Sequence, residues 1–204
     1  MNYKMRIGAD KNQFSGSHGR SNEQKHNDLV ALGYEVIPIP LPFGDYVLFN
    51  ENIEETIARR KDKLKKQDLI ADYKVVVDTK KDLQEVIGNI CSNSHERFRD
   101  ELILAQKMNA QMYILIEDDK VQSFDDLLKW KNPRLTKWEQ VEKAQAEGKM
   151  LNVYHKKKPP TSAKTLYKAM KTMEEKYGCK FLFCRKKNTA RAIVHLLTKG
   201  IEEK

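Results

Sequence analysis

Three residues that follow a short apolar run have side chains that could do chemistry together. Residues 75–77 are all valine, and Asp78, Thr79 and Lys80 come directly after them. Residues two apart on a β-strand point to the same face, so we expect Asp78 and Lys80 to converge. Thr79 should point away and offer only its backbone. Charges at the end of a buried strand are unfavourable unless they are paired, bind a metal or take part in a reaction.

A second carboxylate could join this pair. Asp45 stands in the segment Gly44-Asp45-Tyr46, at the start of another expected strand. If the two strands pair, Asp45 and Asp78 meet at one edge of the sheet with Lys80 beside them. Two carboxylates suit Mg²⁺ or Mn²⁺, which can polarise a phosphoryl oxygen and lower the pKa of a bound water. A lysine can stabilise charge on the phosphate, so the set suits cleavage of a phosphodiester bond. A salt bridge at a strand end is the alternative for Asp78 and Lys80 alone.

The elements that must position these residues follow from hydrophobic patterning and from helix-capping signals. A glycine- and serine-rich stretch over residues 11–21 predicts an exposed loop, and Ser21 is the expected N-cap of the next helix. We expect strand 179–184 to join the same sheet, which favours one domain over residues 1–204, with a core at about 4–118 completed by about 121–204. Expected strands cover residues 5–10, 34–40, 44–50, 74–79, 111–118 and 179–184, and expected helices cover 21–32, 82–92, 95–108, 162–178 and 188–200, with a helical insertion within 51–73.

The composition indicates the class of partner. The chain has 204 residues, 38 Lys and Arg against 29 Asp and Glu, and a formal net charge of +9. Such a basic balance favours nucleic acid, and a merely basic soluble protein is the alternative. The three cysteines form no CxxC pair, which favours reduced thiols. Their spacing, and that of the histidines, is not typical of a zinc site. No apolar run approaches the roughly 20 residues that a membrane span needs. We expect a protein of the cytoplasm, in a prokaryotic or phage-infected cell. The segment Gly-Ser-His-Gly-Arg lacks the ending of a phosphate-binding P-loop, so no nucleotide cofactor is expected.

Four segments in order resemble a known family. They are GDYVLF at 44–49, VVVDTKKDLQEVIGNI at 75–90, HERFRDE at 95–101 and YILIED at 113–118. They are similar to the XPF-type, or ERCC-type, nuclease domain of the PD-(D/E)xK superfamily. The resemblance implies a restriction-endonuclease-like, three-layer α/β fold with a central mixed sheet flanked by helices. It also implies a metal-dependent DNA endonuclease that is structure-specific for branched, flap or junction DNA in recombination or repair.

The resemblance carries roles onto particular residues. Asp45 and Asp78 are implied as ligands of Mg²⁺ or Mn²⁺, with the Thr79 carbonyl also reaching the metal, and Lys80 is implied as the catalytic lysine. Asn12 and Gln13 stand where the family has Arg-Glu, which predicts a depleted shell there. The expected supporting residues are Asp10, Glu101 and Glu85, with Asp82 as the alternative to Glu85, and Arg97 and Arg99 are expected to contact DNA. The basic segment HKKKPP at 155–160 separately predicts DNA contacts by Lys156, Lys157 and Lys158, with a role in solubility as the alternative.

Two further points concern activity and partners. DNA that is branched or partly single-stranded is the implied partner, and the resemblance allows a homodimer. The rival hypothesis is a non-catalytic nucleic-acid-binding scaffold with a degenerate nuclease fold. Such members typically lose the acids or the lysine, whereas Asp45, Asp78 and Lys80 are all present here.

Overall fold

A single mixed sheet organises the protein. The structure is a computed structural model that describes residues 5–92, 95–149 and 158–202. Within them six strands pair in the order β2-β1-β3-β4-β5-β6. Only β3 runs antiparallel to its neighbours, so the carboxyl ends of the other five strands share one edge. The strands are β1 (Arg6–Asp10), β2 (Glu35–Ile39), β3 (Tyr46–Leu48), β4 (Val75–Lys80), β5 (Gln111–Glu117) and β6 (Lys180–Cys184).

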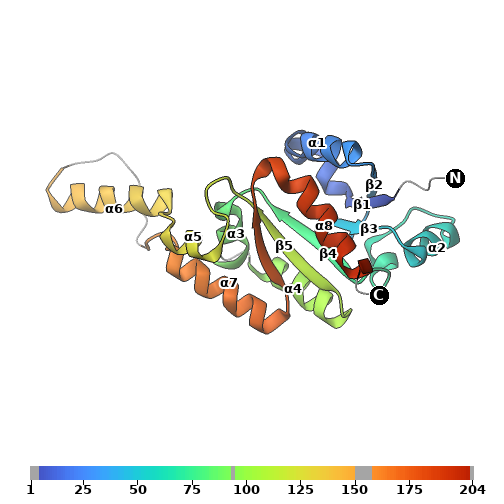
Figure 1. The fold of residues 1–204 in the computed structure, drawn as a ribbon. Helices are drawn as coiled ribbons and strands as arrows, with labels where there is room; N and C mark the ends of the chain where they lie inside the picture. The colour runs from blue at the N-terminus through green and yellow to red at the C-terminus, as the bar shows by residue number, and fades with distance from the viewer. Residues whose placement is uncertain (1–4, 93–94, 150–157, 203–204) are drawn as a thin grey trace.

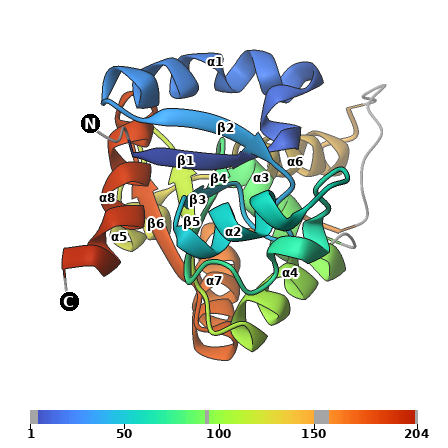
Figure 2. The same cartoon turned by 90° about the vertical axis from the view of Figure 1, so that its right-hand side faces the viewer.

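Helices cover both faces of the sheet. Helices α1 and α8 lie over one face, and α3, α4 and α7 lie over the other (Figures 1 and 2). Helix α6 extends away from the body of the molecule (Figure 1). This is the predicted three-layer α/β fold, and strand β6 joins the sheet as expected. The helices are α1 (Gly16–Ala31), α2 (Glu51–Arg59), α3 (Leu83–Ile90), α4 (His95–Lys107), α5 (Phe124–Lys129), α6 (Pro133–Ala146), α7 (Ala163–Tyr177) and α8 (Thr189–Glu202).

Strand β4 supplies apolar side chains to both layers. Val76 packs in the core beneath α3, α4 and α7, and Val77 packs in the core beneath α1 and α8. Alternation continues to the end of the strand, so Asp78 and Lys80 lie on the α3 and α4 side while Thr79 lies on the α1 side. No helix in the described part of the chain is long and apolar enough to cross a lipid bilayer.

The predicted loop over residues 11–21 is wrong. A 3-10 helix covers Lys11–Phe14, and α1 begins at Gly16, five residues before the expected cap at Ser21. Glycine and serine disfavour a helix intrinsically, but tertiary packing overrides that preference. The face of α1 that carries Asn22, Lys25 and Leu29 is buried, and this burial holds the early turns of the helix against the sheet.

Candidate active site

A polar cavity of about 570 Å³ opens at the carboxyl edge of the sheet. It lies where β1, β4 and β5 end and where the loop before β3 returns to them. The cavity brings together almost all of the residues that the sequence suggested for chemistry. Those that line it are Asp10, Asp45, Asp78, Thr79, Lys80, Glu85, Arg97 and Glu101.

Asp78 and Lys80 form a buried ion pair in this cavity. Lys80 Nζ lies 2.5 Å from Asp78 Oδ2, and both side chains are less than a tenth exposed. The Lys80 ammonium also lies 5.1 Å from the centre of the Phe98 ring on α4. Asp78 Oδ2 accepts no hydrogen bond of normal geometry from the described residues. Its partner is the lysine charge alone.

Burial and neighbouring charges set the protonation of this pair. Burial raises the pKa of Asp78 to about 7, the Lys80 charge opposes that rise, and the Asp45 carboxylate adds to it. Burial lowers the pKa of Lys80, but the carboxylates of Asp78 and Asp45 outweigh it and the net pKa is raised. Burial also raises the pKa of Glu101 on α4. Lys80 is therefore an ammonium at neutral pH, and Asp78 sits close to its titration midpoint.

The backbone around Asp45 fixes where this residue lies. Gly44 before it has φ of +70°, a left-handed conformation that favours glycine. A Cβ at Gly44 would lie 2.2 Å from Val76 Cγ2 on the next strand. The Asp45 N–H donates to the Val77 carbonyl at 2.9 Å. The Gly-Asp pairing in the sequence thus has a packing reason as well as a chemical one.

The Asp45 carboxylate makes contacts that the sequence did not indicate. Asp45 Oδ2 accepts hydrogen bonds from the Thr79 N–H at 2.8 Å and from the Thr79 hydroxyl at 2.7 Å. Asp45 Oδ1 accepts one from Gln13 Nε2 at 2.7 Å. The expectation that Thr79 offers only its backbone is wrong, because Asp45 precedes β3 and its carboxylate reaches the Thr79 hydroxyl. Gln13, which stands where the family has an acid, contacts Asp45 directly through its amide.

The three supporting acids differ in their surroundings. Asp10 accepts from the Asn12 N–H at 2.9 Å and from the Leu41 N–H at 3.0 Å, so it fixes the two loops beside the cavity. Glu85 Oε2 accepts from the Lys81 N–H at 2.9 Å. Glu101 lies 3.6 Å from Arg97 in an ion pair along α4.

Two buried charged residues near the site were missed by sequence reasoning. Lys25 on α1 forms an ion pair with Glu117 at the end of β5, and its Nζ lies 3.4 Å from Thr79 Oγ1. Both line the cavity. The sequence did carry a signal for Lys25. It follows Asn22 by three residues and precedes Leu29 by four, a spacing that places all three side chains on one face of a helix. A lysine on the buried face of a helix needs a partner of opposite charge, and Glu117 at the end of β5 supplies it.

The expected DNA-binding residues lie in different surroundings. Arg97 lines the cavity and its side chain is 86% exposed. Arg99 pairs with its neighbour Asp100. Lys158 is exposed, whereas Lys156 and Lys157 lie outside the described residues.

The donor set fits a hard divalent cation with few protein ligands. The described residues contain no group of three or more His, Cys, Asp or Glu side chains arranged to hold a metal ion. Asp45 and Asp78 are the two carboxylates at this cavity that are expected to hold the ion, with the carbonyl of Thr79, the residue after Asp78. Mg²⁺ commonly takes one or two carboxylates and keeps several waters. The buried Asp78 carboxylate, whose Oδ2 is held by the Lys80 charge alone, suits such an ion.

The pKa of Asp78 leads to a prediction about stability. In the folded protein the Asp78 carboxyl keeps its proton up to about pH 7, whereas in the unfolded chain it loses the proton near its ordinary pKa of 3.8. The folded state therefore binds more protons between these values, so stability should fall as the pH rises from about 4 to about 7 and level off above that. A shift of about three units sets an upper limit of roughly 4 kcal/mol. Urea unfolding of metal-free protein at pH 4, 5.5 and 8 would measure it.

The matched control for that experiment removes both buried charges. Asp78→Asn combined with Lys80→Met leaves no unpaired ion behind, so the variant should fold. Its stability should change less across this pH range than that of the original protein. An equal fall in both proteins would assign the pH dependence to other groups.

Comparison with known proteins identifies the family. The ERCC4 domain matches residues 10–196. XPF from Aeropyrum pernix, in a complex with DNA, superposes with a TM-score of 0.52 and 16% sequence identity over 98% of this chain and 66% of that chain. A second structure of XPF from Aeropyrum pernix gives a TM-score of 0.52 and 17% identity over 96% of this chain and 65% of that chain.

This chain spans just under two thirds of the length of the two XPF chains, and at such identity the likeness shows a shared fold. No curated protein matches the sequence. The domain match covers most of the chain and confirms the family that the motifs had suggested. This chain belongs to the ERCC4 domain family.

Proposed function

We propose that this protein is a metal-dependent endonuclease that hydrolyses phosphodiester bonds in branched, flap or junction DNA during repair or recombination. The observation that carries the proposal is the buried Asp78–Lys80 pair beside Asp45, at one cavity of an ERCC4 domain. A buried ion pair contributes little net stability, because desolvation offsets its Coulomb energy. Its position at a polar cavity favours a catalytic role.

Each residue of the site has a separate task in this proposal. Asp45, Asp78 and the Thr79 carbonyl would hold Mg²⁺ or Mn²⁺. When bound, the ion would polarise a phosphoryl oxygen and lower the pKa of a water. Lys80 remains protonated, because its pKa is raised, so it would orient water and stabilise negative charge on the phosphate rather than accept a proton. Asp10 would hold the two loops that border the cavity.

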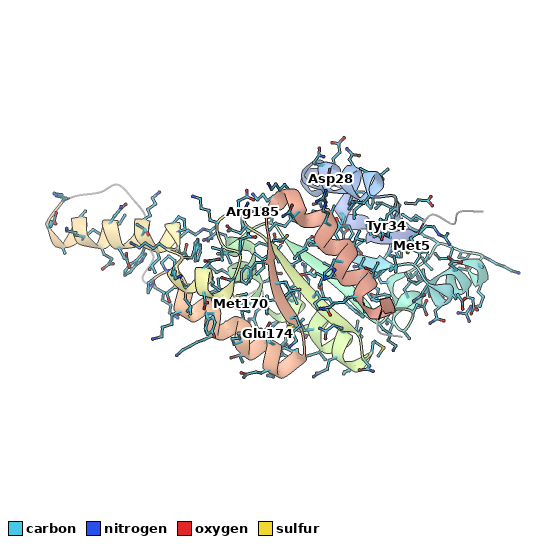
Figure 3. All side chains as sticks on the ribbon, in the orientation of Figure 1. Met5, Asp28, Tyr34, Met170, Glu174 and Arg185 are labelled. Carbon is cyan, nitrogen blue, oxygen red and sulfur yellow. The ribbon has the colours of Figure 1, made fainter. Side chains whose placement is uncertain are left out.

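The carboxyl edge of the sheet also carries a basic surface that suits DNA. Exposed lysines or arginines follow the ends of four parallel strands, and three of these strands, β1, β4 and β5, also border the active-site cavity. Arg185 marks this edge where β6 passes to α8 (Figure 3). Cationic groups on one edge neutralise successive phosphates of a DNA backbone. The residues are Lys11 after β1, Lys81 after β4, Lys120 after β5, and Arg185, Lys186 and Lys187 after β6.

The basic surface leads to a prediction about how DNA affinity depends on salt concentration. Changing Lys186 and Lys187 together to alanine should lower the slope of log affinity against log salt by about 1.8, because each phosphate contact contributes about 0.9. Fluorescence anisotropy with branched DNA from low to moderate salt would measure the slope. The matched control is Lys74→Ala with Lys107→Ala, which removes the same charge from the opposite edge and should change the slope less. If all three proteins gave the same slope, the DNA would not contact Lys186 and Lys187. Contacts by Lys156, Lys157 and Lys158 remain a separate prediction.

A direct test of activity separates the enzyme from the rival scaffold. Fluorescent flap, junction and linear duplex DNA would be incubated with the full chain in Mg²⁺, in Mn²⁺ and in a chelator. The proposal expects cleavage of branched substrates with either metal and none with chelator. A non-catalytic scaffold would bind DNA with the same response to salt and leave every substrate intact. Cleavage that persists in chelator would contradict metal dependence.

A further inference from the structure

We propose that helix α1 positions the Asp45 carboxylate through two chains of buried or partly buried hydrogen bonds, one to each carboxylate oxygen. This inference rests on the proposed function, because it concerns how Asp45 is presented to a cation. The residues that carry it are Lys25 and Thr79 for one oxygen, and Asn22 and Gln13 for the other. None of them is among the acids and the lysine that do the chemistry.

The first chain begins at Lys25. Its ammonium is paired with Glu117 and donates to Thr79 Oγ1 at 3.4 Å, and Thr79 Oγ1 lies 2.7 Å from Asp45 Oδ2. An ammonium group can only donate hydrogen bonds. Thr79 must therefore accept from Lys25 and direct its single hydroxyl proton at Asp45. The direction of the Thr79–Asp45 bond is thus determined by a charge on α1.

The second chain begins at Asn22. Its Nδ2 donates to the backbone carbonyl of Gln13 at 3.5 Å and to Gln13 Oε1 at 2.5 Å. A backbone carbonyl only accepts, so the orientation of the Asn22 amide follows from this contact. Gln13 Oε1 is then an acceptor, and Gln13 presents its Nε2 to Asp45 Oδ1 at 2.7 Å.

Together the two chains leave Asp45 little freedom. With the Thr79 N–H included, Asp45 Oδ2 accepts two hydrogen bonds and Oδ1 accepts one. A carboxylate has about four acceptor positions, so one position on Oδ1 has no partner among the described residues. Hydrogen bonds to a ligand carboxylate orient it and tune its affinity for metal. The arrangement therefore prepares one oxygen of Asp45 for a cation.

The buried charge on α1 supports a positioning role over a purely structural one. Lys25 is 9% exposed, and Asn22 is 7% exposed. Apolar residues of similar size often stabilise a core as well as or better than a buried ion pair. Polar side chains at both positions would add little to stability, whereas they account for the contacts on both Asp45 oxygens.

The test removes one hydroxyl and keeps its backbone. Thr79→Val retains the shape of the side chain, the N–H and the carbonyl, but it breaks the first chain. Mn²⁺ affinity of metal-stripped protein, measured by calorimetry without DNA, should fall by about 10- to 100-fold. Thr79→Ser restores the hydroxyl and should recover affinity to within about threefold of the original protein. With flap DNA, kcat should fall in Thr79→Val while KM stays nearly constant.

The matched control is Thr56→Val. Thr56 is a buried threonine on α2, and its hydroxyl accepts from Arg59 at 3.1 Å, away from the cavity. This variant carries the same chemical change and should keep its Mn²⁺ affinity. Should Thr79→Val fail to fold, Gln13→Met tests the same idea from Oδ1, with the same expected loss.

The outcomes separate the two proposals. Unchanged Mn²⁺ affinity in Thr79→Val and in Gln13→Met overturns the positioning by α1, and the proposed function stands if the original protein still cleaves DNA. Equal losses in Thr79→Val and Thr79→Ser also overturn it, because the hydroxyl would not be the cause. An original protein that neither binds Mn²⁺ nor cleaves DNA overturns both proposals.

Discussion

Replacing Lys80 with methionine should reduce the rate of DNA cleavage by about a thousandfold or more and leave DNA affinity within about threefold. The raised pKa keeps Lys80 as an ammonium, and its buried Nζ lies 2.5 Å from Asp78 at the cavity. A charge in a site from which water is largely excluded acts most strongly on charge that develops during the reaction. An interaction made chiefly in the transition state lowers kcat without weakening substrate binding.

The control for this prediction lies at the other end of the same strand. Lys74 precedes β4, is exposed, and donates to the Met108 carbonyl at 2.9 Å. Lys74→Met removes an equal charge at the opposite edge of the sheet and should cleave DNA at the original rate. Single-turnover cleavage and anisotropy with the same flap DNA would measure rate and affinity. A Lys80→Met variant that keeps full activity would move the catalytic centre away from this cavity.

A second large effect is expected from Asp45→Asn. The change removes a negative charge from the proposed metal centre. If the amide oxygen of the new side chain keeps its hydrogen bonds to Thr79, its NH₂ group faces Gln13 Nε2, which is also a donor. Loss of a ligand carboxylate should lower Mn²⁺ affinity by about 100-fold or more and cleavage by about a thousandfold. Folding should be retained, because Asp45→Asn leaves the Asp78–Lys80 ion pair intact. Calorimetry with Mn²⁺ and cleavage assays over a range of metal concentrations would check both effects.

Asp118→Asn is the matched carboxylate control for Asp45→Asn. Asp118 follows β5, and its Oδ1 accepts from the N–H groups of Lys120 at 2.8 Å and Val121 at 3.0 Å. An amide oxygen can keep both bonds, so this variant should bind metal and cleave DNA normally. If Asp45→Asn bound Mn²⁺ as tightly as Asp118→Asn, Asp45 would not be a ligand. High metal concentration should partly restore cleavage in Asp45→Asn, because the defect lies in binding the ion.

The sequence by itself determined the fold class and the pairing of Asp78 with Lys80. The run of three valines in β4 and the strand and helix signals around it predicted the layered α/β fold. The two-residue spacing of Asp78 and Lys80 placed them on one face, since side chains alternate along a strand. Gly44 before Asp45 carried a further signal, because glycine suits the left-handed turn and the close approach of Val76 that the structure contains.

Other features were decided only by tertiary structure. Local composition predicted a loop over residues 11–21, but burial of one face of α1 made a helix of it. The contacts of Asp45 with Thr79 and Gln13, and of Lys25 with Glu117, join segments 32 to 92 positions apart. No local pattern encodes which polar groups will meet across such separations, because the meeting depends on how the layers pack. The sequence thus pointed to the residues of the candidate site, and the packing of α1 on the sheet determined how Asp45 is held.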